Sequence, residues 1–162
     1  MKRSAWLVYP MVLLLVGVMA AIAGAMMNGP GMFVADYAEN SNFFTMMDSM
    51  QMGKSPHGSV QIYYSTNLKN MLGMASFTAP EGSVSIKPFD NDGKSGVDGI
   101  AVMIKKPAGY DPQNGDWMYE MRTPAGDLMK KDGMPMSGKI PMCIGCHAEY
   151  SATDYLGGTK MR

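Results

Sequence analysis

Both cysteines of this chain and one of its two histidines lie in a single short motif. Cys143, Cys146 and His147 form the sequence C-I-G-C-H, and C-x-x-C-H is the attachment sequence of c-type haem. Two thiols at this spacing can add to the vinyl groups along one edge of a porphyrin, and the next residue can present its imidazole to the iron. We therefore predict one covalently attached haem c, with Cys143 and Cys146 as the attachment sites and His147 as the iron ligand.

Three other roles of a C-x-x-C pair fit the sequence less well. A redox-active dithiol usually precedes a helix in a βαβ pattern, and the sequence has no such pattern. Zinc would need a complete tetrahedral ligand set, and only His57 remains to complete one with Cys143, Cys146 and His147. A disulfide that closes so short a loop would add little stability. Haem attachment is therefore the favoured interpretation.

The N-terminus begins with Lys2 and Arg3 and continues in an uncharged apolar run, Ala5–Met27. A run of about 20 apolar residues suffices to cross a bilayer as a helix. Basic residues before the run and none soon after it favour a cytoplasmic tail by the positive-inside rule. We therefore predict a signal-anchor and linker at residues 1–30 and an exported haem domain at residues 31–162.

A cleaved signal peptide is the alternative to an anchor. Ala23, Gly24 and Ala25 resemble the small-residue site at which signal peptides are cut, although a cleavable signal usually has a shorter apolar stretch. In both cases the haem domain leaves the cytoplasm. With an anchor, the domain stays at the inner membrane and faces the periplasm.

The composition limits the classes of partner. Lys plus Arg and Asp plus Glu are balanced at 14 each, so the chain lacks the positive charge typical of nucleic-acid binding, and we expect no nucleic-acid partner. Methionine is unusually frequent, with 20 in 162 residues. Most of these side chains are expected to fill irregular gaps in the core. Copper(I) binding by the methionines of residues 46–52 is a weaker alternative, based on the softness of the thioether.

The sixth position of the haem iron has several candidate ligands upstream of the motif. Met134, Met136 and Met142 precede it closely, and a methionine ligand would raise the reduction potential and favour electron transfer. His57 is another candidate, although a histidine in P-H-G more often stands at the entry to a strand.

Four segments have the composition of β-strands, being rich in β-branched and aromatic residues or strictly alternating. They are residues 59–65, 82–87, 99–106 and 116–122. Residues 36–52 and 66–74 have the apolar spacing of amphipathic helices, the second with Thr66 as its N-cap. We predict an α+β fold, in which a small antiparallel β-sheet has flanking helices and haem is bound near the C-terminus, with a transmembrane helix at the N-terminus.

Several strings of this sequence, in order, resemble segments of the cytochrome P-460 family, which includes the cytochromes c′-beta. The strings are SPHGSVQIYYS, APEGSVSIK, IAVMIKK with YDPQNGDWMYEMR, and CIGCHAEYSATDY. The resemblance covers roughly residues 37–156 and includes the acidic residue Asp154. It implies a dimeric antiparallel sheet with flanking helices and a haem held by C-x-x-C-H.

The resemblance also implies a role for Lys87. Members called P-460 carry an additional bond from a lysine to the porphyrin and oxidise hydroxylamine, and that lysine matches Lys87. Strict alternation places Lys87 on the same strand face as Ser83 and Ser85, whose small side chains leave room for a flat macrocycle. The alternative is a solvated lysine on an edge strand, because Pro88 follows and prolines favour edges.

The match departs from the hydroxylamine-oxidising members at the position of their catalytic glutamate. In those members it lies in the strand after the lysine, where this chain has Ala101. A register shift of three residues would bring Asp98 to that position. Without a positioned base, a proton-transfer contribution of about 10²–10⁴-fold would be lost. Hydroxylamine oxidation is therefore the less favoured activity.

We predict a membrane-anchored, periplasm-facing monohaem cytochrome c with a role in redox or electron transfer. Its expected partner is a redox protein or membrane complex, and the resemblance adds a possible homodimer. One alternative is the oxidation of hydroxylamine, or a related small nitrogen compound, at a lysine-crosslinked haem. A second alternative is the binding of nitric oxide or carbon monoxide at a five-coordinate iron.

Overall fold

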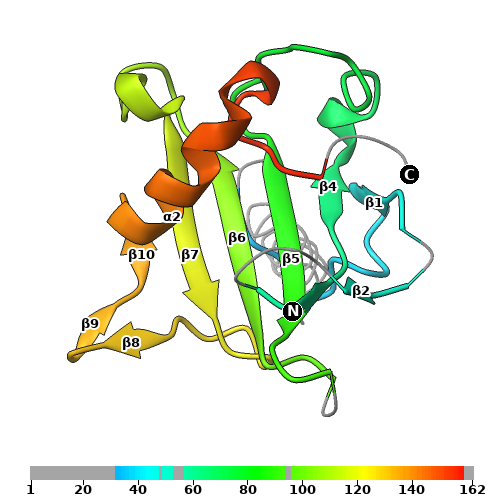
Figure 1. Cartoon of the computed structure of the whole chain (residues 1–162), viewed down its shortest axis with the longest axis vertical. Coiled ribbons are helices and arrows are strands. Elements are labelled where there is room, and N and C mark those ends of the chain that lie inside the picture. Colours follow the sequence, from blue (N-terminus) through cyan, green and yellow to red (C-terminus); the bar gives the residue numbers. More distant parts are fainter. Residues whose placement is uncertain (1–31, 48, 53–56, 94–95, 159–162) are drawn as a thin grey trace, which may run out of the picture.

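The computed structural model describes residues 32–47, 49–52, 57–93 and 96–158. The predicted anchor at residues 1–30 lies outside these ranges. Among the described residues, no helix has both the length and the apolar character needed to span a bilayer. The described chain forms one main antiparallel sheet with a helical segment near its C-terminal end (Figure 1).

The main sheet consists of short strands around three longer central ones. The strands run in the order β1 (Phe43–Thr45), β4 (Tyr63–Ser65), β5 (Val84–Asp90), β6 (Gly99–Lys105), β7 (Trp117–Arg122) and β10 (Ser137–Gly138), while β3 (Ser59–Val60) pairs with β5, and β2 (Gln51–Met52) pairs with β3. A separate hairpin is formed by β8 (Lys130–Lys131) and β9 (Met134–Pro135). Every pairing is antiparallel.

The predicted strands at 82–87, 99–106 and 116–122 are present as β5, β6 and β7. The predicted strand at 59–65 is divided into β3 and β4, which pair with successive parts of β5. The division lies opposite Pro88, which has no N–H to donate to the ladder. Only the proline carbonyl is used there, accepting a hydrogen bond from the Gln61 backbone at 3.3 Å.

The edge-strand interpretation of Lys87 is wrong. Lys87 lies in β5, which has β4 and β3 on one side and β6 on the other. Pro88 is tolerated in this interior strand because its missing N–H falls at the gap between β3 and β4. The side chain of Lys87 is half-buried.

The amphipathic helix predicted at 36–52 is also wrong. The described residues of this segment form turns followed by β1 and β2. Phe43 packs on one face of the sheet and Phe44 on the other. Adjacent apolar residues on opposite faces are the arrangement of a strand, so pairing with β4 has outweighed the local helical spacing.

The second predicted helix, at 66–74, is reduced to a single 3₁₀ turn, η1 (Thr66–Leu68), followed by further turns. Ser65, not Thr66, occupies the N-cap position, and it makes no side-chain cap bond. Its hydroxyl instead accepts a hydrogen bond from the Val84 backbone at 2.8 Å. Leu68 is fully buried and anchors the turn to the sheet.

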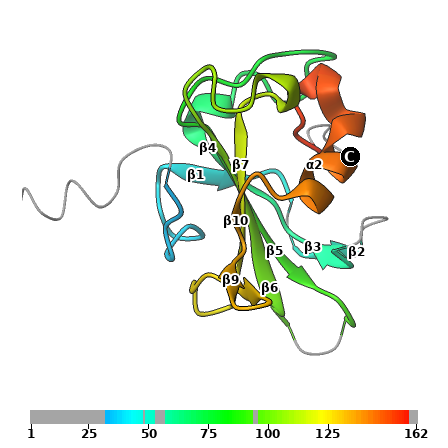
Figure 2. The same ribbon diagram turned by 90° about the vertical axis from the view of Figure 1, so that its left-hand side faces the viewer.

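Two apolar clusters occupy the two faces of the sheet. The first contains Val84, Ile86, Ile100, Val102 and Ile104, covered by Phe33, Tyr37, Phe43, Tyr63 and Met118. The second contains Ile62, Tyr64, Leu68, Ala79, Met103, Trp117, Tyr119 and Leu156, with Cys143 and Ile144 packed against it. The C-x-x-C-H segment therefore lies on the second face, while β1 lies towards the opposite side (Figure 2).

The predicted small antiparallel sheet is confirmed, and so is the position of the cysteine motif after the last strand. The helical part is smaller than predicted. Within the described ranges it consists of short 3₁₀ turns and the C-terminal segment that carries the motif.

Candidate haem-binding site

The C-x-x-C-H motif forms α2 (Pro141–His147), which continues into the 3₁₀ segment η3 (Ala148–Thr153). Pro141 occupies the first turn, where its missing N–H has no intrahelical acceptor and its fixed φ suits a helix. Side chains three apart on a helix are neighbours on its surface, so Cys143 and Cys146 lie on one side. Both cysteines are free thiols, Cys143 half-buried against the core and Cys146 exposed. This arrangement suits attachment to a group that covers the helix.

His147 has a defined hydrogen-bond partner. Its Nδ1 atom lies 2.7 Å from the backbone oxygen of Tyr155. Because a carbonyl can only accept, Nδ1 must carry the proton and donate it, and in the neutral ring the Nε2 lone pair is left for a metal ion. Burial lowers the pKa of His147; the bond to Tyr155 acts in the opposite direction, and the charge of Lys87 lowers the pKa further.

The backbone that supplies this carbonyl is held in an uncommon conformation. Asp154 and Tyr155 both have positive φ, at 49° and 65°. The Asp154 carboxylate is buried and paired with Lys105, with 2.6 Å between Nζ and Oδ2. The indole N–H of Trp117 donates to the Asp154 carbonyl at 2.8 Å. The segment after η3 is therefore fastened to β6 and β7.

Lys87 lies on the second face of the sheet, towards α2. Val84 and Ile86 belong to the cluster on the first face, so alternation turns Lys87 to the second. Burial lowers the pKa of Lys87, and its charge in turn lowers the pKa of both His147 and His57. The structure thus brings Lys87 near both histidines.

His57 is the second histidine on this face. Its ring centroid lies 5.4 Å from that of Phe89 in β5. Its pKa is lowered from 6.5 to about 4, mainly by burial, with smaller contributions from Lys87 and His147. His57 is therefore neutral near pH 7.

Tyr119 is a member of this site that sequence reasoning missed. It is 2% exposed in β7, and its ring centroid lies 5.6 Å from that of His147. Its hydroxyl and that of Ser83 are buried without a hydrogen-bond partner in the described part of the chain. A buried hydroxyl normally has a partner, and both of these are already enclosed by the protein's own atoms. The sequence feature that could have placed Tyr119 on this face is the alternation of β7, in which Tyr119 pairs with Met103.

The residues that the sequence suggested as a catalytic base or a sixth iron ligand lie in different parts of the structure. Ala101 is the cross-strand partner of Lys87, so no acid stands directly across from the lysine. The carboxylate of Asp98 instead accepts a hydrogen bond from the Asn91 backbone at 2.7 Å. Met134 and Met142 are turned to solvent, with 70% and 64% of their surface exposed. These two methionines contribute little to the face that carries His147.

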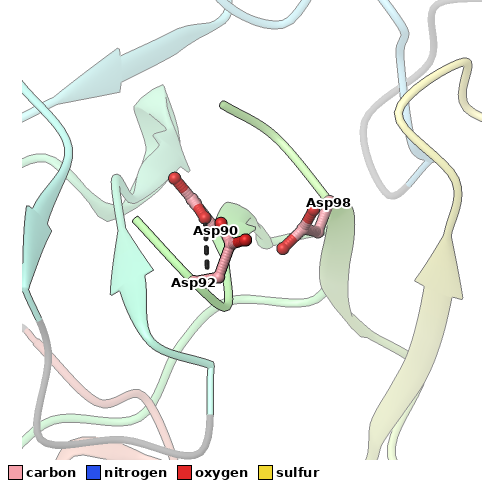
Figure 3. A group of neighbouring side chains, drawn as sticks. All are labelled: Asp90, Asp92 and Asp98. Atoms are coloured by element: carbon pink, nitrogen blue, oxygen red, sulfur yellow. Dashed lines mark hydrogen bonds between the residues drawn. The ribbon is translucent and has the colours of Figure 1, made fainter. Parts of the chain in front are cut away.

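A zinc-type site is not formed by the histidines and cysteines in the described ranges. There, the one group of three or more His, Cys, Asp or Glu whose ligand atoms lie within 4.8 Å of one another is Asp90, Asp92 and Asp98. This acidic group lies at the turn between β5 and β6 (Figure 3). One Asp90 oxygen accepts hydrogen bonds from the backbone of Asp92 at 3.1 Å and of Gly93 at 2.7 Å. These bonds give the cluster a role in closing the hairpin.

Comparison of the chain with models of known protein families and with curated proteins finds no match. Two thiols at the right spacing and an imidazole with its Nδ1 proton donated to a carbonyl fit a covalently held haem.

Proposed function

We propose that this protein is a monohaem c-type cytochrome that serves redox or electron transfer. The observation that carries the proposal is the hydrogen bond from His147 Nδ1 to the Tyr155 carbonyl, on the helix that also presents two free thiols. A histidine that ligates a metal almost always donates its other ring N–H to such an acceptor. Haem, when bound, would supply one-electron chemistry at its iron.

Residues of the C-x-x-C-H motif would hold the haem. Cys143 and Cys146 would hold the haem through thioether bonds, and His147 would supply Nε2 as a ligand to its iron. On the second face of the sheet, Ser83 and Ser85 are buried by the protein itself, and Ala101 is half-buried. Of these small side chains, Ala101 beside Lys87 is the one that a flat ring could approach.

The surroundings of Lys87 favour electron transfer over hydroxylamine oxidation. The cross-strand neighbour Ala101 cannot accept a proton, and the carboxylate of Asp98 bonds to the hairpin backbone. His57, on the same face and neutral near pH 7, is a candidate for a sixth ligand, as is the half-buried Met136. Two axial ligands would leave no open position for a substrate.

Hydroxylamine oxidation is the second candidate, favoured by one observation. Lys87 is half-buried, its pKa is lowered by burial, and it interacts electrostatically with His147. Burial makes it easier for Lys87 to lose its proton, and loss of that proton is needed before the amine can bond to a porphyrin carbon. A Lys87 cross-link would therefore support this alternative, and an open five-coordinate iron without a cross-link would support the binding of nitric oxide or carbon monoxide.

The location and partners belong to the same proposal. Residues 1–30 would anchor the protein in the inner membrane, and residues 31–162 would form the haem domain facing the periplasm. The redox partner would be a protein or membrane complex there, and the chain would also be able to form a homodimer. The apolar run preceded by Lys2 and Arg3 supports this orientation.

Intact mass after acid-acetone extraction tests haem attachment. The wild-type chain, produced with a c-type maturation system, should keep a mass increase of one haem. Cys143→Ser combined with Cys146→Ser should return the bare polypeptide. Met142→Leu is the matched control, because Met142 lies exposed on the same helix and its variant should keep the haem. A wild-type mass equal to the bare polypeptide would overturn the proposal.

The optical spectrum of the ferrous protein then distinguishes the three activities. A six-coordinate low-spin spectrum supports electron transfer. A five-coordinate spectrum that changes on addition of carbon monoxide supports gas binding. A Soret band shifted far to the red supports the lysine-crosslinked enzyme.

A further inference from the structure

We propose that Lys105 and Asp154 are positioning residues for His147, acting through the carbonyl of Tyr155. This inference rests on the proposed function, because it concerns the properties of His147 as a haem ligand. Neither residue touches the imidazole. They hold the backbone that accepts its proton.

The Lys105–Asp154 pair is buried and hydrogen-bonded to its surroundings. Both side chains are 9% exposed, and Nζ lies 2.6 Å from Oδ2. Lys105 also donates to the Gly115 carbonyl at 2.7 Å. The same Asp154 oxygen accepts from the Ala79 backbone at 2.9 Å, and the Asp154 carbonyl accepts from Trp117 at 2.8 Å. Asp154 is thereby held from three directions, by β6, by β7 and by the loop before β5.

Asp154, the fastened residue, is the one that ends η3. Asp154 and the next residue, Tyr155, have φ values of 49° and 65°, a left-handed conformation that residues other than glycine seldom adopt. Such a conformation persists only where the surroundings hold it. The ring of Tyr155 packs where a side chain at Gly115 would be, 2.5 Å from an added Cβ, and its hydroxyl donates to the Gln113 carbonyl at 3.0 Å.

The consequence appears at His147. With Asp154 and Tyr155 held in this conformation, the Tyr155 carbonyl is directed at Nδ1, 2.7 Å away. That bond sets the tautomer and the orientation of the ring, and it makes Nε2 a more electron-rich ligand. An electron-rich axial ligand stabilises the oxidised iron and lowers the reduction potential. Loosening the Lys105–Asp154 pair should therefore raise the potential without touching a ligand.

The test compares Asp154→Asn, Lys105→Met and the double variant with wild type, all as the haem-loaded full chain. Asn tolerates the left-handed conformation and still has an oxygen for the Ala79 N–H. The double variant buries no unpaired charge, so it keeps the test informative if either single variant folds poorly. Lys139→Met is the control, because Lys139 is half-exposed and 3.9 Å from its partner Asp111.

The readouts are the midpoint potential and the iron–histidine stretching band, recorded after photolysis of the carbon monoxide adduct. We expect the variants of the pair to raise the potential and lower the stretching frequency, with Lys139→Met unchanged. Attached haem with the wild-type potential and band in every variant would overturn this inference alone. A wild-type chain without covalent haem would overturn the proposed function, and the inference with it.

Discussion

Replacing Asp154 by Asn should strongly destabilise the fold, independently of any effect on haem. The change leaves the ammonium of Lys105 buried, with both side chains of the pair 9% exposed in the wild type. Removing one partner of a buried ion pair typically costs about 3–5 kcal/mol, because an uncompensated charge stays inside. In a domain of this size, about 1 kcal/mol corresponds to about 4 °C in melting temperature. We expect a decrease of about 12–20 °C.

A double-mutant cycle separates the pair from its surroundings. Lys105→Met alone should also destabilise, because the Asp154 carboxylate keeps only its bond from Ala79. The double variant Lys105→Met with Asp154→Asn should cost clearly less than the sum of the two, since neither charge is then left unpaired. The measurement is urea and thermal unfolding followed by circular dichroism.

The control for this cycle is Lys139→Met. The Lys139–Asp111 pair has a 3.9 Å separation and a lysine side chain 50% exposed, so its removal should cost about 0–1 kcal/mol. The reasoning would be refuted by single-variant costs at Lys105 and Asp154 as small as this control. Strict additivity in the double variant would refute it as well.

Two further predictions concern the second face of the sheet. Lys87→Leu should change the free energy of unfolding little, because burial already disfavours the charged amine. If the wild type has a red-shifted ferrous Soret band, this variant should restore an ordinary c-type spectrum. An unchanged red shift in the variant would exclude a Lys87 cross-link. The second prediction concerns His57, whose pKa is about 4 in the fold against 6.5 ordinarily. Between these pH values the unfolded chain binds more protons than the folded chain. The free energy of unfolding should therefore fall as the pH decreases from about 6.5 to about 4. After discounting for partial exposure, the stability lost through His57 over this pH range is about 1–2 kcal/mol. The free energy of unfolding of His57→Gln, measured against pH, should therefore decrease less steeply than that of wild type. A slope equal to that of wild type would contradict the pKa shift.

Local features of the chain were predicted well from sequence. Alternation in residues 82–87 located β5 and correctly separated the Lys87 face from the face of Val84 and Ile86. The predicted strands at 99–106 and 116–122 match the bounds of β6 and β7 to within one residue at each end. The C-x-x-C-H motif places two thiols and an imidazole close together because they are near neighbours in sequence, and haem attachment to them stays a prediction.

The failures arose where a non-local partner changed the outcome. Residues 36–52 have helical apolar spacing, but pairing of β1 with β4 uses Phe43 and Phe44 on opposite faces. Pro88 suggested an edge strand, yet the gap between β3 and β4 accommodates it in the interior. Spacing along the chain says which side chains can share a face, but it does not reveal which strand will lie beside them.

The surroundings of His147 were decided by tertiary structure alone. Nothing in the local sequence indicates that Lys105 in β6 meets Asp154 after η3, or that the carbonyl of Tyr155 is thereby directed at Nδ1. The sequence by itself determined the chemical groups of the motif and the alternation of the central strands, because both depend on near neighbours. The tertiary structure determined which proton His147 carries and what faces it, because those depend on groups that only the packing of the C-terminal segment against the sheet brings together.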